Sequence, residues 1–224
     1  MFVGLVLQLA YDLERHRLFD IPLRNWLILV CIILPIATWL RFLEAGRLIA
    51  ALVTLSAVGI LIAIWWAGRQ RYVRFVDHSG STKTEARQRL PASPLPAMSK
   101  TRIHATGFFE VSGMRRYFVE TPADYTTFET REHCIMTQIR RSRFLLVASS
   151  DQSEVGWWYT FFQPSMLKSA SIGWLSFGPR PRLAVRLAIA LPDGAGDEIL
   201  YLSFDDEALR SLVLDDLKQG ADLA

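Results

Sequence analysis

The sequence predicts an α+β protein in which two apolar helices precede a domain made of an antiparallel sheet and a final helix. Residues 48–68 contain no charged side chain, and residues 25–40 form another uncharged run shortly before them. From residue 101 onward the hydrophobic pattern changes from a helical period to alternation, which is typical of half-buried strands. A proline-containing polar segment separates the two patterns.

The second apolar run is long enough to cross a bilayer. At a rise of about 1.5 Å per residue, the uncharged stretch between Arg47 and Arg69 covers the roughly 30 Å of a hydrocarbon core. The first run is shorter, and the arginines at its two ends would reach the headgroups by snorkelling. A re-entrant segment is the alternative for this first run. We expect a transmembrane hairpin in residues 23–75, with helices at about 25–43 and 47–68.

Charges and aromatic rings near the two runs predict how the hairpin is oriented. Three arginines precede the first run and three follow the second, whereas the connecting turn has two arginines and Glu44. Because cytoplasmic loops carry the excess of positive charge, both termini and the β-domain are expected in the cytoplasm, at the inner (plasma) membrane. Residues typical of membrane interfaces lie at the ends of the spans: Trp26, Trp39, Trp65, Trp66, Arg69 and Arg71.

Neither apolar run contains an ionisable side chain. Ion and proton pathways normally need one within the membrane, so the hairpin is interpreted as an anchor rather than a transporter. Residues 1–22, with apolar positions spaced by three and four, predict an amphipathic helix on the membrane surface, and a partner-binding helix is the alternative. Residues 76–100 predict a linker.

The linker and its flanks are basic. Residues 68–102 contain eight basic and two acidic side chains, which would draw this segment toward anionic lipids of the inner leaflet. A solvated linker that follows the positive-inside rule explains the same charge. The whole chain has a formal charge of only +3, which gives no argument for nucleic-acid binding.

The β-domain is expected over residues 101–219. Its clearest strand is 182–191, where five branched aliphatic side chains alternate with arginine and alanine. Pro122 is expected to interrupt an earlier strand, and about seven strands are predicted in total. A helix over 205–219 follows, with Asp205 as its N-cap.

One stretch has the features of a known type of domain: RLAVRLAIALPDGAGDEILYLSFDDEALRSLVLDDL, residues 182–217. Here a strand hairpin leads through Phe204 and Asp205 into a helix with leucine spacing. This order resembles a pleckstrin-homology (PH) type domain, and the chain resembles bacterial membrane proteins that join a two-helix hairpin to such a domain. The resemblance covers residues 101–219 and implies a bent antiparallel sheet, or partly open barrel, capped by a C-terminal helix. A lipocalin-like or other small barrel is the alternative.

The same resemblance directs attention to basic residues. Family members that bind phosphoinositides use basic side chains in and beside the first strand hairpin, where this chain has a short turn followed by Arg115 and Arg116. Bacterial members act in many cases as interaction or assembly modules. Arg140, Arg141 and Arg143 form a further cluster that could complete an anion-binding face turned to the membrane, or simply a solvated strand end.

The sequence contains no recognisable catalytic or metal-binding motif. The four histidines lack ligand spacing, and no paired-cysteine, HExxH, GxSxG or glycine-rich phosphate motif is present. His133 and Cys134 are adjacent, but neighbouring strand side chains point to opposite faces. The run from Trp157 to Tyr159 is interpreted as core with one exposed ring. We therefore predict no catalytic residues, no cofactor and no metal.

These observations predict a non-enzymatic, membrane-anchored interaction or scaffold protein. Its cytoplasmic PH-like domain is expected to bind a protein partner or an anionic membrane surface. The alternative is an accessory subunit of a larger membrane complex, packed through small residues of its second apolar helix. A membrane-associated enzyme is the third hypothesis.

Overall fold

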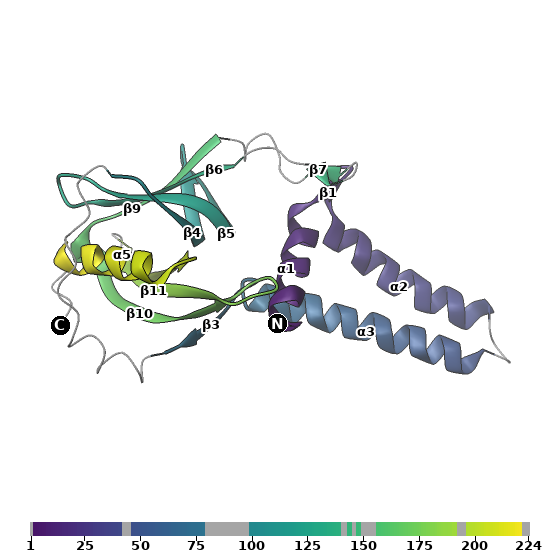
Figure 1. The fold of residues 1–224 in the computed structure, drawn as a ribbon. Helices are drawn as coiled ribbons and strands as arrows, with labels where there is room; N and C mark the ends of the chain where they lie inside the picture. The colour runs from purple at the N-terminus through teal and green to yellow at the C-terminus, as the bar shows by residue number, and fades with distance from the viewer. Residues whose placement is uncertain are drawn as a thin grey trace. The chain divides into compact units, whose positions relative to one another are not determined.

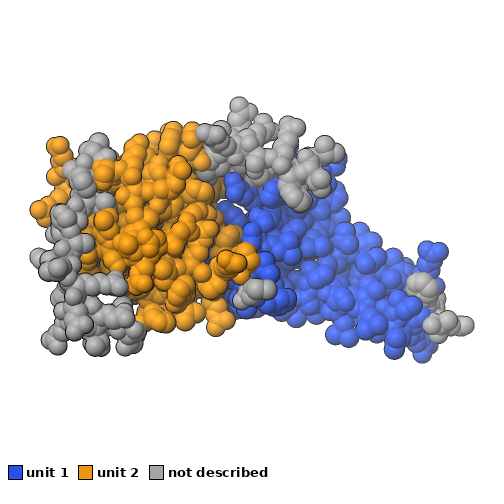
Figure 2. Space-filling view, in the orientation of Figure 1, with its two compact units in different colours: residues 1–73, 140–155 blue, residues 74–139, 156–224 orange. Residues whose placement is uncertain are grey.

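The computed structural model describes residues 2–41, 46–78, 99–139, 143–144, 147–148, 156–191 and 196–220 (Figure 1). The chain is α+β and forms two compact units, which Figure 2 colours separately. Unit 1 comprises residues 1–73 and 140–155, and unit 2 comprises residues 74–139 and 156–224.

Three helices make up most of unit 1: α1 (Phe2–Arg15), α2 (Leu23–Arg41) and α3 (Arg47–Arg69). By length and composition, α2 and α3 are each able to cross a membrane. Their apolar side chains are mostly exposed, as Leu40 and Leu48 illustrate at 70% and 75%, so they do not resemble the buried core helices of a soluble protein. The bounds differ by no more than two residues from those expected from the uncharged runs.

The amphipathic helix expected in residues 1–22 ends at Arg15, and a short hairpin follows it. Strands β1 (Arg17–Leu18) and β2 (Ile21–Pro22) flank Phe19 and Asp20, which both have positive φ, as a type I′ turn requires. β1 also pairs with β8 (Val147–Ala148), which pairs with β7 (Arg143–Phe144). Unit 1 therefore contains a four-stranded sheet in the order β2-β1-β8-β7.

Unit 2 is built on an eight-stranded antiparallel sheet in the order β3-β10-β11-β12-β4-β5-β6-β9. Its strands are β3 (Arg74–Asp77), β4 (Thr101–Val111), β5 (Met114–Thr127), β6 (His133–Ile139), β9 (Gly156–Phe162), β10 (Leu167–Ser176), β11 (Arg182–Ala190) and β12 (Asp197–Phe204). One edge of β4 pairs with β12 around Ala105 and with β9 at Glu110. Because β9 also pairs with β6, the strands β4, β5, β6 and β9 close into a ring.

Two strands differ from the expected pattern. β5 runs straight through Pro122, because the ladder is already irregular just before it: Glu120 has a φ of 46°, and its N–H donates to the Thr106 hydroxyl at 2.8 Å. The sheet also begins earlier than residue 101, since β3 starts at Arg74, five residues after α3 ends. Residues 79–98, most of the expected linker, lie outside the described part.

The core of unit 2 lies between the inner faces of the strands and helix α5 (Glu207–Gly220), which Figure 1 shows beside β11. Val213, Leu214 and Leu217 of α5 are buried in this core. The helix begins differently from the expectation: Asp206, rather than Asp205, accepts a hydrogen bond from the Ala208 N–H at 3.2 Å.

Candidate functional site

The arginines beside the first hairpin of unit 2 already have partners. The turn itself is formed by Ser112 and Gly113, both with positive φ. Arg115 lies 2.5 Å from Glu198 on β12, and its guanidinium stands 4.5 Å from the centre of the Phe108 ring. This pairing fixes Arg115 against the sheet and neutralises it, which leaves less positive charge for an anionic surface than the sequence suggested.

The arginine at position 143 and the arginines beside the first hairpin belong to different units. Arg143 begins β7 in the small sheet of unit 1, whereas Arg115 and Arg116 belong to unit 2. Arg140 and Arg141 lie outside the described residues. The expected interface residues do lie at the ends of α2 and α3, where the Trp26 indole donates to the Leu18 carbonyl at 3.2 Å and the Trp39 indole donates to the Thr54 hydroxyl at 3.1 Å.

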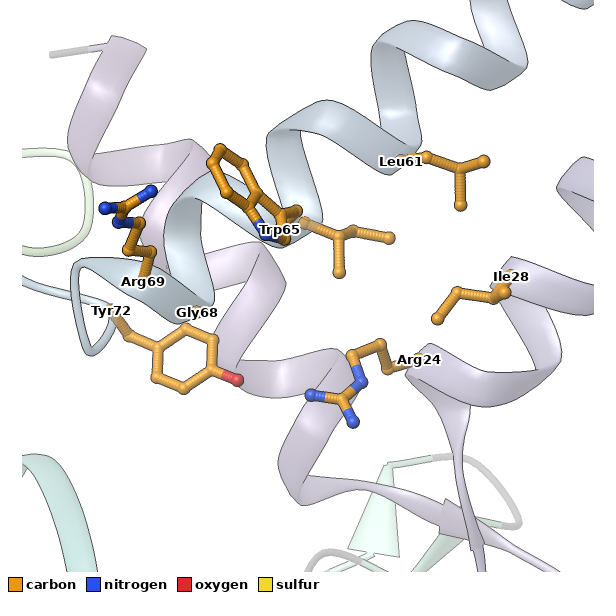
Figure 3. A pocket seen from close by; sticks show the side chains of 8 residues that line it. Arg24, Ile28, Leu61, Trp65, Gly68, Arg69 and Tyr72 are labelled. Atoms are coloured by element: carbon orange, nitrogen blue, oxygen red, sulfur yellow. The ribbon is translucent and has the colours of Figure 1, made fainter.

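A cavity of about 710 Å³ lies in unit 1 between α2 and α3 (Figure 3); we name it the α2–α3 cavity. It is lined by Arg24 and Ile28 of α2, by Leu61, Ile64, Trp65 and Arg69 of α3, and by Tyr72 beyond the end of α3. Because α2 begins where α3 ends, the hairpin brings both arginines to the same end of the cavity. The opposite end is apolar.

The turn after α3 places Tyr72 at this cavity. Arg71 and Tyr72 have φ values of 51° and 64°, the left-handed region that side chains other than glycine seldom adopt. The Tyr72 N–H donates to the Ala67 carbonyl at 2.9 Å, so the chain reverses around the last turn of the helix. Arg24 hydrogen-bonds to the Tyr72 hydroxyl. Burial, with a further contribution from Glu14, raises the pKa of Tyr72, so its hydroxyl stays protonated.

Unit 2 exposes a row of aromatic side chains along β9. Trp157 and Phe161 are 40% and 57% exposed, whereas Trp158 and Phe162, on the opposite face of the strand, are buried at 3% and 2%. Tyr159 lies between the two exposed rings and stacks on Phe161 with a centroid distance of 5.7 Å. We define the β9 face as Trp157, Tyr159 and Phe161, together with Phe128, stacked on Phe161 at 6.4 Å, and Met136, opposite Tyr159.

A shallow hollow of about 140 Å³ adjoins the β9 face at Trp157. Met136 and Gln138 line it from β6, and Asp124 lines it from β5. Arg102 on its border lies 3.8 Å from Asp124. The sequence interpretation of Trp157–Tyr159 as core with one exposed ring agrees with the exposure of Trp157 and the burial of Trp158, but it did not extend to Phe161. The alternation of GWWYTFF, with aromatic residues at both phases of the strand, was the available signal.

A buried polar cluster joins β5 and β6 to α5. The Tyr125 hydroxyl donates to Asp216 at 2.7 Å and lies 2.8 Å from Nδ1 of His133, while the Thr127 hydroxyl also donates to Asp216, at 2.5 Å. Burial lowers the pKa of His133, although Asp216 opposes the shift, so the ring is neutral. Nε2 of His133 has no partner in the part of the chain that is described.

A second cluster surrounds the irregularity in β5. The Ser203 hydroxyl donates to Glu120 at 2.5 Å, and Arg182 lies 3.6 Å from the same carboxylate and 3.3 Å from Asp205. Arg182 also lies 2.6 Å from Nδ1 of His104. Burial, above all, raises the pKa of Glu120 and lowers that of His104. These contacts join four strands, β4, β5, β11 and β12, so we interpret the cluster as structural.

His133 and Cys134, adjacent in the sequence, do not form a nucleophile–base pair. Cys134 lies on the face of β6 opposite to His133, and burial raises the pKa of its thiol to about 11, far from that of a nucleophilic cysteine. Among the described residues no three His, Cys, Asp or Glu side chains gather as metal ligands. Comparisons of the chain with protein-family models, curated proteins and solved structures gave no match.

Proposed function

We propose that this protein is a non-enzymatic, membrane-anchored docking protein that holds a protein partner on the β9 face of unit 2. In this proposal α2 and α3 form a transmembrane hairpin, both termini lie in the cytoplasm, and unit 2 is a PH-like module. The closed ring of β4, β5, β6 and β9, together with the C-terminal helix packed on the core, supports the PH-like assignment.

The exposure of Trp157 and Phe161 is the observation that carries the proposal. A sheet that faces water on one side normally carries polar side chains there, and large exposed apolar groups mark interaction surfaces. Tryptophan and tyrosine dominate the binding energy of protein interfaces because they bury a large area with few rotatable bonds. The hollow beside Trp157 would receive a side chain of the partner.

The charges around the β9 face favour a protein over an anionic membrane. Arg102 at the border of the hollow is paired with Asp124, and Glu110, opposite Tyr159, also adds negative charge. Attraction to anionic lipids needs a clear excess of basic side chains. A mixed surface of this kind instead offers complementary pairs to a protein.

The accessory-subunit alternative has less support. Its argument was that small residues of the second apolar helix would let a neighbouring subunit pack closely. The small residues that carry this argument are Ala50, Ala51, Ser56, Ala57 and Gly59. Ala50 and Ala57 are already buried, at 0% and 7% exposure, whereas the other three are exposed, so only part of this surface is available to a neighbouring subunit.

The test uses the full chain in native membranes with a photo-crosslinking residue at Phe161. We expect one defined adduct, lost in the Trp157→Thr variant. A crosslinker at Lys168, an exposed position on β10, is the matched control and should give no such adduct. The absence of a Phe161 adduct in membranes, or an adduct insensitive to Trp157→Thr, would contradict the proposal.

A second measurement distinguishes a partner from the bilayer. The two native cysteines are buried, so a Phe161→Cys variant accepts an environment-sensitive dye at one exposed position. In nanodiscs without a partner, we expect the emission of a dye in water. A shift to the emission of an apolar environment under these conditions would mean that the β9 face lies on the membrane.

A further inference from the structure

The α2–α3 cavity combines an apolar lining with two guanidinium groups. Its interior is lined by the apolar side chains of Ile28, Leu61 and Ile64, and its mouth has two guanidinium groups, of Arg24 and Arg69. Figure 3 shows Leu61 far from Tyr72, and Ile28 one helical turn beyond Arg24. A volume of about 710 Å³ is within the range of roughly 300–1,000 Å³ typical of small-molecule sites. The cavity is therefore amphipathic along its length, and an occupant would have a polar head and an apolar tail.

The charges at the mouth of the cavity indicate the charge of the polar headgroup that would bind there. Arg24 is held 2.6 Å from Glu14 of α1, so this pair is close to neutral. Arg69 stacks on Trp65, with its guanidinium 5.4 Å from the ring centre, and has no carboxylate partner among the described residues. The two arginines and one glutamate leave a single net positive charge, which matches the single negative charge of a phosphodiester. The protonated Tyr72 hydroxyl adds a neutral hydrogen-bond donor.

The backbone at the mouth of the cavity is strained, and contacts with the last turn of α3 hold Tyr72 in place there. Two consecutive left-handed residues, Arg71 and Tyr72, are unfavourable for side chains other than glycine and persist only where the surrounding contacts require them. Here they bring the Tyr72 ring back beside Gly68, whose Cα would carry a Cβ only 3.9 Å from the Tyr72 hydroxyl. The ring thereby lines the basic end of the cavity.

We infer that the α2–α3 cavity binds one anionic glycerophospholipid of net charge −1. Arg69 and Arg24 contact its phosphate, Tyr72 donates to a phosphate or glycerol oxygen, and an acyl chain lies against Ile28, Leu61 and Ile64. Basic pockets between transmembrane helices recognise lipid headgroups in this way. Such a lipid differs from the general lipid shell because its headgroup is selected, and it would fill the space where α2 and α3 diverge.

The experiment titrates the full chain, purified in a non-ionic detergent, with phosphatidylglycerol and with phosphatidylcholine of the same chain length. Native mass spectrometry counts the lipids bound. We expect the first phosphatidylglycerol to bind at least 10-fold more tightly than phosphatidylcholine. Arg69→Gln should abolish this preference, whereas Arg41→Gln, an arginine at the far end of α2, is the matched control and should retain it.

Two further experiments test the contribution of the acyl chain and that of the headgroup phosphate separately. Leu61→Trp, which fills the apolar end without changing charge, should weaken binding of phosphatidylglycerol severalfold. Glycerol 1-phosphate at millimolar concentration, which has the headgroup phosphate but no chains, should not displace the lipid. Equal binding of the two lipids by the wild-type chain, equal loss in Arg41→Gln, or displacement by glycerol 1-phosphate would each overturn the inference.

The size-exclusion profile and the helix content of each variant distinguish misfolding from loss of the site. Arg69→Gln leaves the Glu14–Arg24 pair intact. The readout concerns unit 1 alone, whereas the docking proposal concerns the β9 face of unit 2. A chain that selects phosphatidylglycerol but captures no partner, or the reverse, would therefore show which of the two statements fails.

Discussion

Gly173 of β10 lies directly against the backbone of Val76 in β3. A Cβ on Gly173 would lie 2.2 Å from the Val76 carbonyl oxygen and 2.6 Å from Cζ of Phe75. The Phe75 ring also packs against Tyr201, with a centroid distance of 5.5 Å. The strand that follows α3 is therefore attached to the sheet at a position where only glycine leaves room for it.

Gly173→Ala is expected to release or displace β3. The added methyl group overlaps backbone, which cannot move aside as a flexible side chain can, so we expect a loss of about 1–3 kcal/mol in the free energy of unfolding of unit 2. Hydrogen exchange should accelerate at the amides of residues 74–77. Ser171→Ala, two positions earlier on the same strand, is the control and should change stability by less than about 0.5 kcal/mol. Unchanged exchange in residues 74–77 would contradict this account of Gly173.

Tyr125→Phe tests whether the buried polar cluster stabilises the packing of α5 against the sheet. The substitution removes the hydroxyl that joins Asp216 to His133 and leaves buried polar atoms with fewer partners, which costs about 1–3 kcal/mol. The loss should appear in chemical denaturation and as faster exchange in α5. Tyr159→Phe removes a hydroxyl from the partly exposed β9 face and is the matched control, expected to be close to neutral. Equal effects of the two substitutions would mean that the cluster contributes nothing beyond packing.

The parts of the fold that depend on local pattern were predictable. The uncharged runs predicted α2 and α3 to within two residues at each end, and the alternation over 182–191 predicted β11. Both signals lie within a single segment of the sequence, so they can be recognised without knowledge of the tertiary structure. The strand through Pro122 was not predictable, since the irregularity at Glu120 depends on Thr106 of another strand.

The candidate sites depend more strongly on contacts between distant residues. Tyr125 and Asp216 are 91 positions apart, so no local pattern reveals their hydrogen bond. The α2–α3 cavity needs the left-handed turn at Arg71 and Tyr72, which neither residue type favours. The pairing of Arg115 with Glu198 likewise depends on the order of the strands, and for this reason basic residues counted along the chain overstated the free positive charge.

The stability of unit 2 should fall as the pH decreases through the usual pKa of histidine. Burial lowers the pKa of His133 in the native state, so below a pH of about 6.5 the unfolded chain binds a proton that the native protein does not. Above that pH the ring is neutral in both states and contributes no slope. His133→Gln should reduce the loss of stability between pH 7 and pH 5, measured by chemical denaturation at each pH. Part of the pH dependence of stability should remain in the variant, because the pKa of His104 is also lowered by burial. An identical slope in the variant would show that His133 is not the responsible group.

The phase of β9 separates residues that hold the fold from residues that are available for binding. Phe162→Ala should cost about 3–5 kcal/mol, because the ring is 2% exposed and its removal leaves a cavity in the core. Phe161→Ala, the adjacent residue with the same side chain, should cost less than about 1 kcal/mol, since 57% of that side chain already contacts solvent. Comparing the two variants by chemical denaturation controls for residue type and strand. Similar losses would mean that Phe161 is needed for the fold, and the reason to assign the β9 face to a partner would then disappear.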